Sequence, residues 1–200
     1  MKRTFEEALE HRRTYYAIGS ESPVYDEEIV HVIRNAVKHV PSAFNSQSTR
    51  VVLLFAEEHQ KLWNIVKEVL RKRIPEEEYH KTEKKIDGSF ASGHGTVLFF
   101  EDQTVVRGLQ ENFPAYSDNF PVWSQQTSGM HQLAVWTMLE DLGLGASLQH
   151  YNPLIDKEVR DTWNLPDTWL LIAEMPFGIP TAEPGLKEMK ELTERIKVFR

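Results

Sequence analysis

The chain has 200 residues, of which 40% are hydrophobic and 26% charged, which is enough apolar material for one globular domain with a substantial core. Its formal net charge of -7 argues against attraction to nucleic acid or to an anionic membrane surface. It contains no cysteine, so disulfides, thiolate nucleophiles and cysteine-bound metal clusters are excluded, and any redox chemistry requires a bound cofactor.

Neither a secretory signal nor a membrane span is expected. The first residues, 1–7, lack an apolar run, and no stretch approaches the roughly 20 apolar residues that a membrane helix needs. We therefore expect a cytoplasmic protein with neither membrane nor nucleic acid as a partner.

Helical and strand patterns alternate along the chain. Apolar spacing predicts a short helix over 4–12, a helix from Asp26 (a candidate N-cap) up to Pro41, and a helix whose apolar face includes Leu62 to Leu70. Further helices are predicted over 102–112, 124–142 and 154–163, and strands over 51–55, 95–100, 146–149 and 169–175. The charged stretch 76–85 indicates an exposed helix or a mobile segment.

Two of these segments favour burial against something else. The helix over 124–142 is apolar on most sides, which is typical of a core or interface helix. Beyond Pro180 the chain is charged but carries Leu192, Ile196, Val198 and Phe199, which are too apolar to be left in water. A second subunit is the natural surface for this tail.

Two short polar stretches are the strongest functional signals. Residues 11–16 (HRRTYY) place two guanidiniums beside a hydroxyl, and residues 41–48 (PSAFNSQS) place hydroxyls and two carboxamides on a loop after a helix. Arginine grips phosphate in a bidentate fork, and asparagine or glutamine both donates to and accepts from the edge of a heterocycle. Either stretch alone is weak evidence, because surface arginines and polar turns are common.

Their order and spacing resemble the nitroreductase family of FMN-dependent oxidoreductases, and the similarity covers nearly the full length. It is greatest to the branch with the fungal fatty-acid-repression proteins and their bacterial relatives, over 41–47, 95–102, 143–153 and 175–180. The resemblance implies one α+β domain over 1–200, a three-layer α/β/α fold with a central, mainly antiparallel sheet. It also implies a homodimer with two FMN sites at the subunit interface and a tail, about 180–200, that docks on the partner.

The resemblance also assigns residues to the flavin. Arg12, Arg13 and Thr14 would hold the phosphate and ribityl chain, and Lys187 and Lys190 would complete the phosphate site. The isoalloxazine ring and ribityl hydroxyls would be met by the remaining residues, which are Asn45, Ser46, Gln47, Gln149 and His150.

One position departs from the family pattern. Where many relatives carry a lysine or arginine that reaches the N1/O2 edge of the flavin, this chain has Tyr16, which brings no charge. Because that edge becomes negative on reduction, a neutral residue there implies a lower reduction potential. Lys84 or Lys85 could supply the charge, although their charged surroundings favour simple solvation.

The stretch 113–123 is rich in aromatic residues separated by prolines. Such rings usually pack in a core or a dimer interface, but a rigid loop could equally cover a planar cofactor, with Tyr116 and Trp123 facing the substrate. The eight histidines show no metal-ligand spacing, so we expect no metal.

The function implied by the resemblance is an FMN-dependent NAD(P)H oxidoreductase. NADH or NADPH would pass hydride to flavin N5 in a ping-pong reaction, and a nitroaromatic or quinone-like acceptor would then be reduced, with His150 as a weak candidate proton donor. Two alternatives remain, namely a flavin-binding regulator or carrier with little turnover, and an interaction protein without a cofactor.

Overall fold

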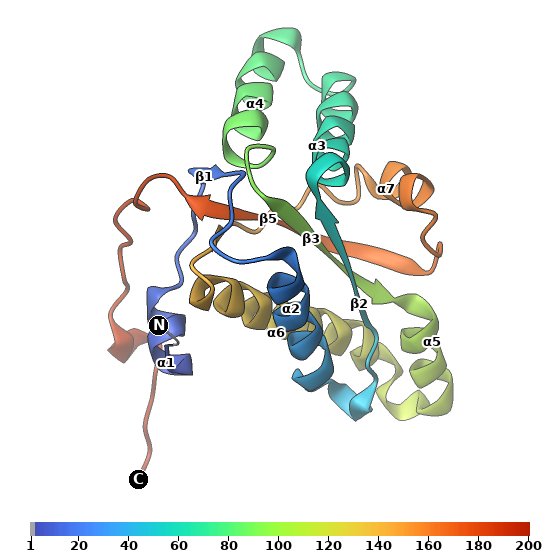
Figure 1. Ribbon diagram of the computed structural model, residues 1–200. Helices are drawn as coiled ribbons and strands as arrows, with labels where there is room; N and C mark the ends of the chain where they lie inside the picture. The colour runs from blue at the N-terminus through green and yellow to red at the C-terminus, as the bar shows by residue number, and fades with distance from the viewer. Residues whose placement is uncertain (1–2) are drawn as a thin grey trace.

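A five-stranded antiparallel sheet lies at the centre of the computed structural model, which describes residues 3–200 (Figure 1). The strands are β1 (Ile18–Gly19), β2 (Thr49–Phe55), β3 (Gly95–Asp102), β4 (Gly145–Ala146) and β5 (Trp169–Pro180). Their order is β1-β5-β3-β2, and β4 pairs with β5 outside this path. The long central strands β3 and β5 therefore support both the short strands and the loops around them.

Helices cover both faces of the sheet. They are α1 (Phe5–His11), α2 (Asp26–His39), α3 (Ala56–Arg71), α4 (Glu76–Ser89), α5 (Gln103–Asn112), α6 (Phe120–Asp141) and α7 (Asp156–Trp163), with short 3-10 helices η1 (Ala43–Asn45), η2 (Pro114–Asn119) and η3 (Leu192–Glu194). Alternate residues of β3 enter different cores: Val97 and Phe99 pack with α2 and α6, whereas Leu98 and Phe100 pack with α3, α4 and α7. This arrangement confirms the predicted α+β fold, with helices on both faces of an antiparallel sheet.

Several predicted boundaries were wrong. Helix α2 begins at Asp26 but its N-cap is Tyr25. Of the two alternatives for the charged stretch 76–85, the exposed helix is the one observed, as part of α4. Helix α6 begins at Phe120, because Pro121 lies in the first turn, where the missing N–H costs nothing. The expected strand over 146–149 is reduced to β4 and one bridge between Gln149 and Glu174.

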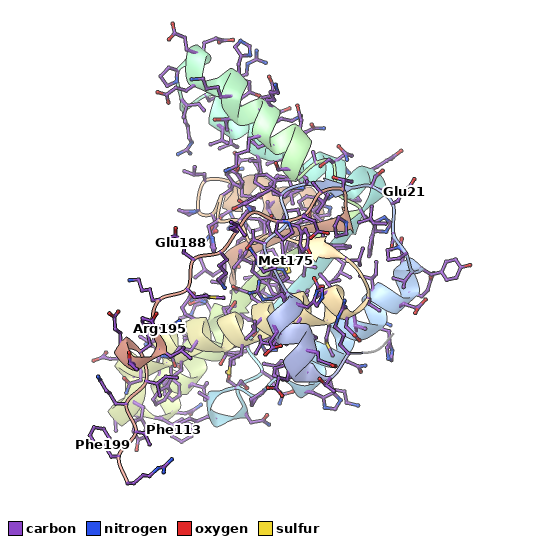
Figure 2. All side chains as sticks on the ribbon, turned by 90° about the vertical axis from the view of Figure 1, so that its left-hand side faces the viewer. Glu21, Phe113, Met175, Glu188, Arg195 and Phe199 are labelled. Atoms are coloured by element: carbon purple, nitrogen blue, oxygen red, sulfur yellow. The ribbon has the colours of Figure 1, made fainter. Side chains whose placement is uncertain are left out.

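The C-terminal tail runs past α1 and, apart from η3, has no regular structure (Figure 1). Glu188, Arg195 and Phe199 mark its course in Figure 2, and the Phe199 side chain is 92% exposed. None of the helices in residues 3–200 combines the length and hydropathy needed to cross a membrane.

Candidate functional site

The predicted phosphate residues lie directly after α1, on a backbone that is held against β4. Thr14 forms a parallel bridge to Ala146, and the Tyr15 N–H donates to the Ala146 carbonyl at 3.0 Å. The approach is so close that a Cβ added at Gly145 would lie 2.8 Å from both Cβ and Cγ of Tyr15. Residues 14–15 can therefore lie this close to β4 only because residue 145 is a glycine.

The two arginines of this segment have different surroundings. The Arg12 guanidinium lies over the Trp136 ring of α6, with Cζ 4.5 Å from the ring centroid, and its buried Nε has no hydrogen-bond partner among residues 3–200. Burial lowers the pKa of Arg12, which the carboxylate of Glu140 opposes. Arg13 instead donates to the Gly185 carbonyl, which brings the beginning of the tail beside it. Both Lys187 and Lys190, further along this tail, are exposed.

Tyr16 lies at an aromatic surface with a lysine nearby. Its side chain is half exposed, and its ring centroid lies 6.3 Å from that of Phe90. The Lys85 Nζ lies 5.9 Å from the Tyr16 ring and 5.6 Å from the Phe90 ring. Lys85 is exposed, as simple solvation predicts, and its ammonium also lies near the Tyr16 ring.

The segment after β4 carries the other predicted residues on this side. The Gln149 N–H donates to the Glu174 carbonyl at 2.7 Å, and the Glu174 N–H donates back to Gln149 at 3.0 Å. The Gln149 side chain donates to Ser147, and His150 is exposed. Residues 12–16 lie against β4, and residues 149–150 follow β4 in the chain. We call these two segments together the N-terminal group.

The predicted residues Asn45, Ser46 and Gln47 lie elsewhere, in the loop around η1. Left-handed backbone angles at Phe44 (φ 57°), Asn45 (φ 52°) and Gln47 (φ 49°) turn the chain sharply there. The loop is closed by a hydrogen bond of 2.9 Å from the Gln47 N–H to the Ser42 hydroxyl.

A buried carboxylate anchors the end of this loop. Glu101 of β3 accepts hydrogen bonds from the hydroxyls of Ser48 and Thr49, the latter at 2.6 Å. Burial raises the pKa of Glu101, and these two hydroxyls oppose that shift. Glu101 was not predicted from the sequence, because a glutamate in a strand gives no sign of the loop that it supports.

Aromatic side chains surround the same loop. The Phe44 ring lies 5.9 Å from Tyr116 and 6.0 Å from Trp123, the latter nearly parallel at 19°, and it also contacts Phe113 and Phe120. A surface cavity of about 340 Å³ opens beside Phe44 and Trp123. The structure thus places the predicted Tyr116 and Trp123 together around Phe44, a residue that the sequence did not single out. An apolar ring in an otherwise polar loop is the feature of the sequence that could have indicated a role for Phe44.

We call this second cluster, residues 43–47 with Tyr116 and Trp123, the loop group. It is far from the N-terminal group within one chain (Figure 1). Phe44 contacts Trp123 near the start of α6, whereas Arg12 contacts Trp136, thirteen residues further along the same helix. At about 1.5 Å per residue, these contacts are about 20 Å apart along the helix axis. The structure therefore does not bring all the predicted flavin residues together in a single chain.

Comparison with known proteins agrees with this fold. The sequence profile of the nitroreductase family matches residues 9–179, so the chain belongs to the nitroreductase family. The nitroreductase FRM2 of Saccharomyces cerevisiae is 34% identical over 182 residues, which cover 90% of each protein. The nitroreductase CinD from Lactococcus lactis, solved with nicotinic acid, superposes with a TM-score of 0.92 at 45% identity, covering 98% of this chain and all of CinD.

A more distant solved structure shares the fold alone. It is a nitroreductase with bound FMN from Desulfitobacterium hafniense, which has a TM-score of 0.72 at 13% identity and covers both chains completely. The family membership and fold are thus established, and the chain is an oxidoreductase of the nitroreductase type.

Proposed function

We propose that this protein is an FMN-dependent NAD(P)H oxidoreductase that reduces nitroaromatic or quinone-like acceptors. The observation that carries the proposal is the N-terminal group, in which Arg12, Arg13 and Thr14 directly precede the half-exposed Tyr16 on a backbone held against β4. The nitroreductase of D. hafniense binds FMN, and CinD has been solved with nicotinic acid and with 4-nitrophenol. A phosphorylated flavin, a pyridine ring and a nitroaromatic ring are the corresponding ligands for this chain.

The residues present fit FMN. The buried Arg12 Nε lacks an acceptor among residues 3–200, and burying such a donor is costly unless a ligand satisfies it. A phosphate carries close to two negative charges, which Arg12, Arg13 and Thr14 can neutralise and bind. Lys187 and Lys190 would add charge to that site from the tail, which Arg13 already contacts at Gly185.

We infer that the site is completed by a second copy of the chain. Asn45, Ser46 and Gln47 are about 20 Å along α6 from Arg12, so one flavin meets both groups only if they come from different subunits. Helix α6 also exposes apolar side chains, with Met130 and Leu133 each 42% exposed. A homodimer would cover this surface, together with the apolar residues of the tail.

Each group then has a distinct task. FMN would supply the hydride chemistry, accepting a hydride from NADH or NADPH and passing it to the acceptor. The N-terminal group binds the phosphate and presents Gln149 and His150 to the ring, and the exposed His150 is the candidate proton donor. The loop group contributes carboxamides to the ring edge, while Phe44, Tyr116 and Trp123 offer flat apolar surfaces for a planar acceptor.

An anaerobic spectral titration tests this proposal. The purified protein, incubated with FMN and desalted, should show flavin bands at about 370 and 450 nm that bleach when NADH or NADPH is added. An Arg12→Met variant should lose most of the bound flavin. Arg71→Met, at the last residue of α3, should retain it, although Arg71 also lies over an aromatic ring, that of Tyr79. Bands that persist with both nucleotides would favour a flavin carrier, and a protein that retains no FMN would favour an interaction protein without a cofactor.

A further inference from the structure

A buried carboxylate lies behind the segment that presents Gln149 and His150. The Glu174 side chain of β5 is completely buried, and its Oε2 accepts the N–H of Tyr151 at 2.8 Å. Its other oxygen, Oε1, is also buried and has no hydrogen-bond partner among residues 3–200. Directly across the sheet on β3 lies the apolar Leu98. An acidic group is therefore buried here with only part of its hydrogen-bonding capacity used.

The main chain of Glu174 also holds the segment that contains Gln149 and His150. Glu174 and Gln149 exchange two backbone hydrogen bonds, of 2.7 and 3.0 Å. Gln149 and Tyr151, on either side of His150, are thus fixed by the backbone and by the carboxylate of Glu174, respectively. Any residue except proline at position 174 could make the main-chain contacts to Gln149, whereas the contact to the Tyr151 N–H is made by the carboxylate.

Aromatic packing connects this contact to the proposed flavin site. The Tyr151 ring lies 6.3 Å from Phe90, at 69°, and Phe90 lies 6.3 Å from Tyr16. Tyr151, Phe90 and Tyr16 thus form a chain of neighbouring rings that leads from the Glu174 contact to the surface at Tyr16, and His150 is the neighbour of Tyr151 in sequence. Since protein interiors are closely packed, a small shift at Tyr151 has little room to be absorbed.

The charge of Glu174 is finely balanced. Burial raises its pKa to about 7, although the N–H groups of Tyr151 and Asn152 stabilise the ionised form. The ionisable groups that act on it are Asp156, at the start of α7, and Tyr151, and both are acids. Burial and the charge of Glu174 raise the pKa of Tyr151 to about 12, so this phenol stays neutral. Among the described residues, 3–200, no cation is one of the main groups that shift the pKa of Glu174.

We propose that Glu174 is a positioning residue for the flavin site, and that its charge state sets how firmly residues 149–152 are held and hence how tightly FMN binds. The ionised carboxylate accepts the Tyr151 N–H in a charge-assisted hydrogen bond, which is about twice as strong as the neutral one left after protonation. This inference rests on the proposed function, because it assumes that the segment contacts FMN.

The expected effect follows from hydrogen-bond strengths. The difference between a charge-assisted and a neutral hydrogen bond corresponds to about a fivefold change in affinity. Wild-type FMN binding should therefore weaken by about fivefold between pH 8 and pH 6 through Glu174. Because the FMN phosphate itself titrates near pH 6, this effect has to be measured relative to variants with the same phosphate site.

The first experiment needs no flavin. In the cofactor-free wild-type protein, the amide proton of Tyr151 should shift in a one-proton transition between pH 5.5 and 8.5, as followed by NMR. Glu174→Gln, which keeps an acceptor but no charge, should abolish that transition. A Tyr151 amide that does not titrate in the wild-type protein overturns the proposal, whatever the variant does.

The second experiment measures FMN affinity at pH 6 and pH 8 for the wild-type protein, Glu174→Gln and Tyr79→Phe. Tyr79 of α4 is also buried, and its hydroxyl donates to Glu83 of the same helix, so Tyr79→Phe is a control that removes a side-chain hydrogen bond away from residues 149–152. The ratio of affinities at the two pH values should fall by about fivefold in Glu174→Gln and stay at the wild-type value in Tyr79→Phe. An unchanged ratio in Glu174→Gln refutes the role in FMN binding. If the wild-type protein binds no FMN at either pH, the proposed function and the flavin part of this inference both fail, and the amide titration alone decides whether Glu174 controls the segment.

Discussion

Replacing Gly145 by alanine should damage both the fold and the flavin site, because β4 and residues 14–15 approach so closely. The new Cβ would lie 2.8 Å from Cβ and Cγ of Tyr15, and ordinary contacts begin at 3.4 Å, so the backbones have to separate by about 0.6 Å. The atoms that it meets are at the base of the Tyr15 side chain, which cannot rotate away. Overpacking of this kind typically costs about 1–3 kcal/mol of unfolding free energy.

The displacement also reaches the proposed phosphate site. Thr14 and Tyr15 are bonded to Ala146, so separating the two backbones moves Thr14 and Arg13 away from their positions. We expect FMN affinity to fall by about tenfold or more, because binding groups tolerate little misplacement. Urea unfolding at one fixed protein concentration and FMN fluorescence quenching measure the two effects.

Gly108→Ala provides the control for this substitution. Gly108 lies within α5 with no atom near its added Cβ, and alanine is the better helix former by about 1 kcal/mol. This variant should be slightly more stable than the wild-type protein and should bind FMN normally. If Gly145→Ala matches the wild-type protein in both stability and FMN affinity, the argument from close approach is refuted.

Three further predictions concern other residues. Tyr16→Lys should raise the two-electron midpoint potential of bound FMN by on the order of 30 mV, since a cation favours the reduced form, and a potentiometric titration showing no rise would contradict this. His59 is buried with its pKa lowered to about 4, so it stays neutral while the unfolded chain takes up a proton below about pH 6.5. Compared with His59→Gln, the wild-type protein should lose about 1–3 kcal/mol of stability as the pH falls from 6.5 to 4, and parallel stability curves would refute this. Phe44→Ala should raise KM for a nitroaromatic acceptor several-fold, because Phe44 is half exposed at the centre of the aromatic cluster, and an unchanged KM in steady-state assays would contradict this role.

The local pattern of the sequence predicted most of the elements and the layered fold. Helices such as α2 have clear apolar stripes, and β3 is a continuous apolar run, so their type follows from spacing alone. Helix α6 was predicted too short because Pro121 looked like a breaker, although a proline is well tolerated in the first turn. The charged stretch in α4 did not distinguish a helix from a mobile segment, because its buried residues, Tyr79 and Ile86, are too far apart in sequence to show a helical period.

The site was less predictable, because its supports come from distant parts of the chain. Arg12 and Gln47 were singled out by residue type and resemblance, but nothing in the sequence showed that about 20 Å of α6 separates their segments. The buried carboxylates of Glu101 and Glu174 lie in strands, where a glutamate normally indicates an exposed position. Only the tertiary structure shows that each of them anchors one of the two segments.

Subunit complementation tests the central claim, that each FMN site combines the N-terminal group of one copy with the loop group of another. Arg12→Met and a double variant, Asn45→Ala with Gln47→Ala, should each form folded dimers that retain little FMN. When the two chains are coexpressed in equal amounts, half of the dimers are mixed and each of these has one intact site. The mixture should therefore recover about a quarter of the wild-type FMN content. A mixture of folded, exchanging subunits that binds no more FMN than its parents would contradict the shared site.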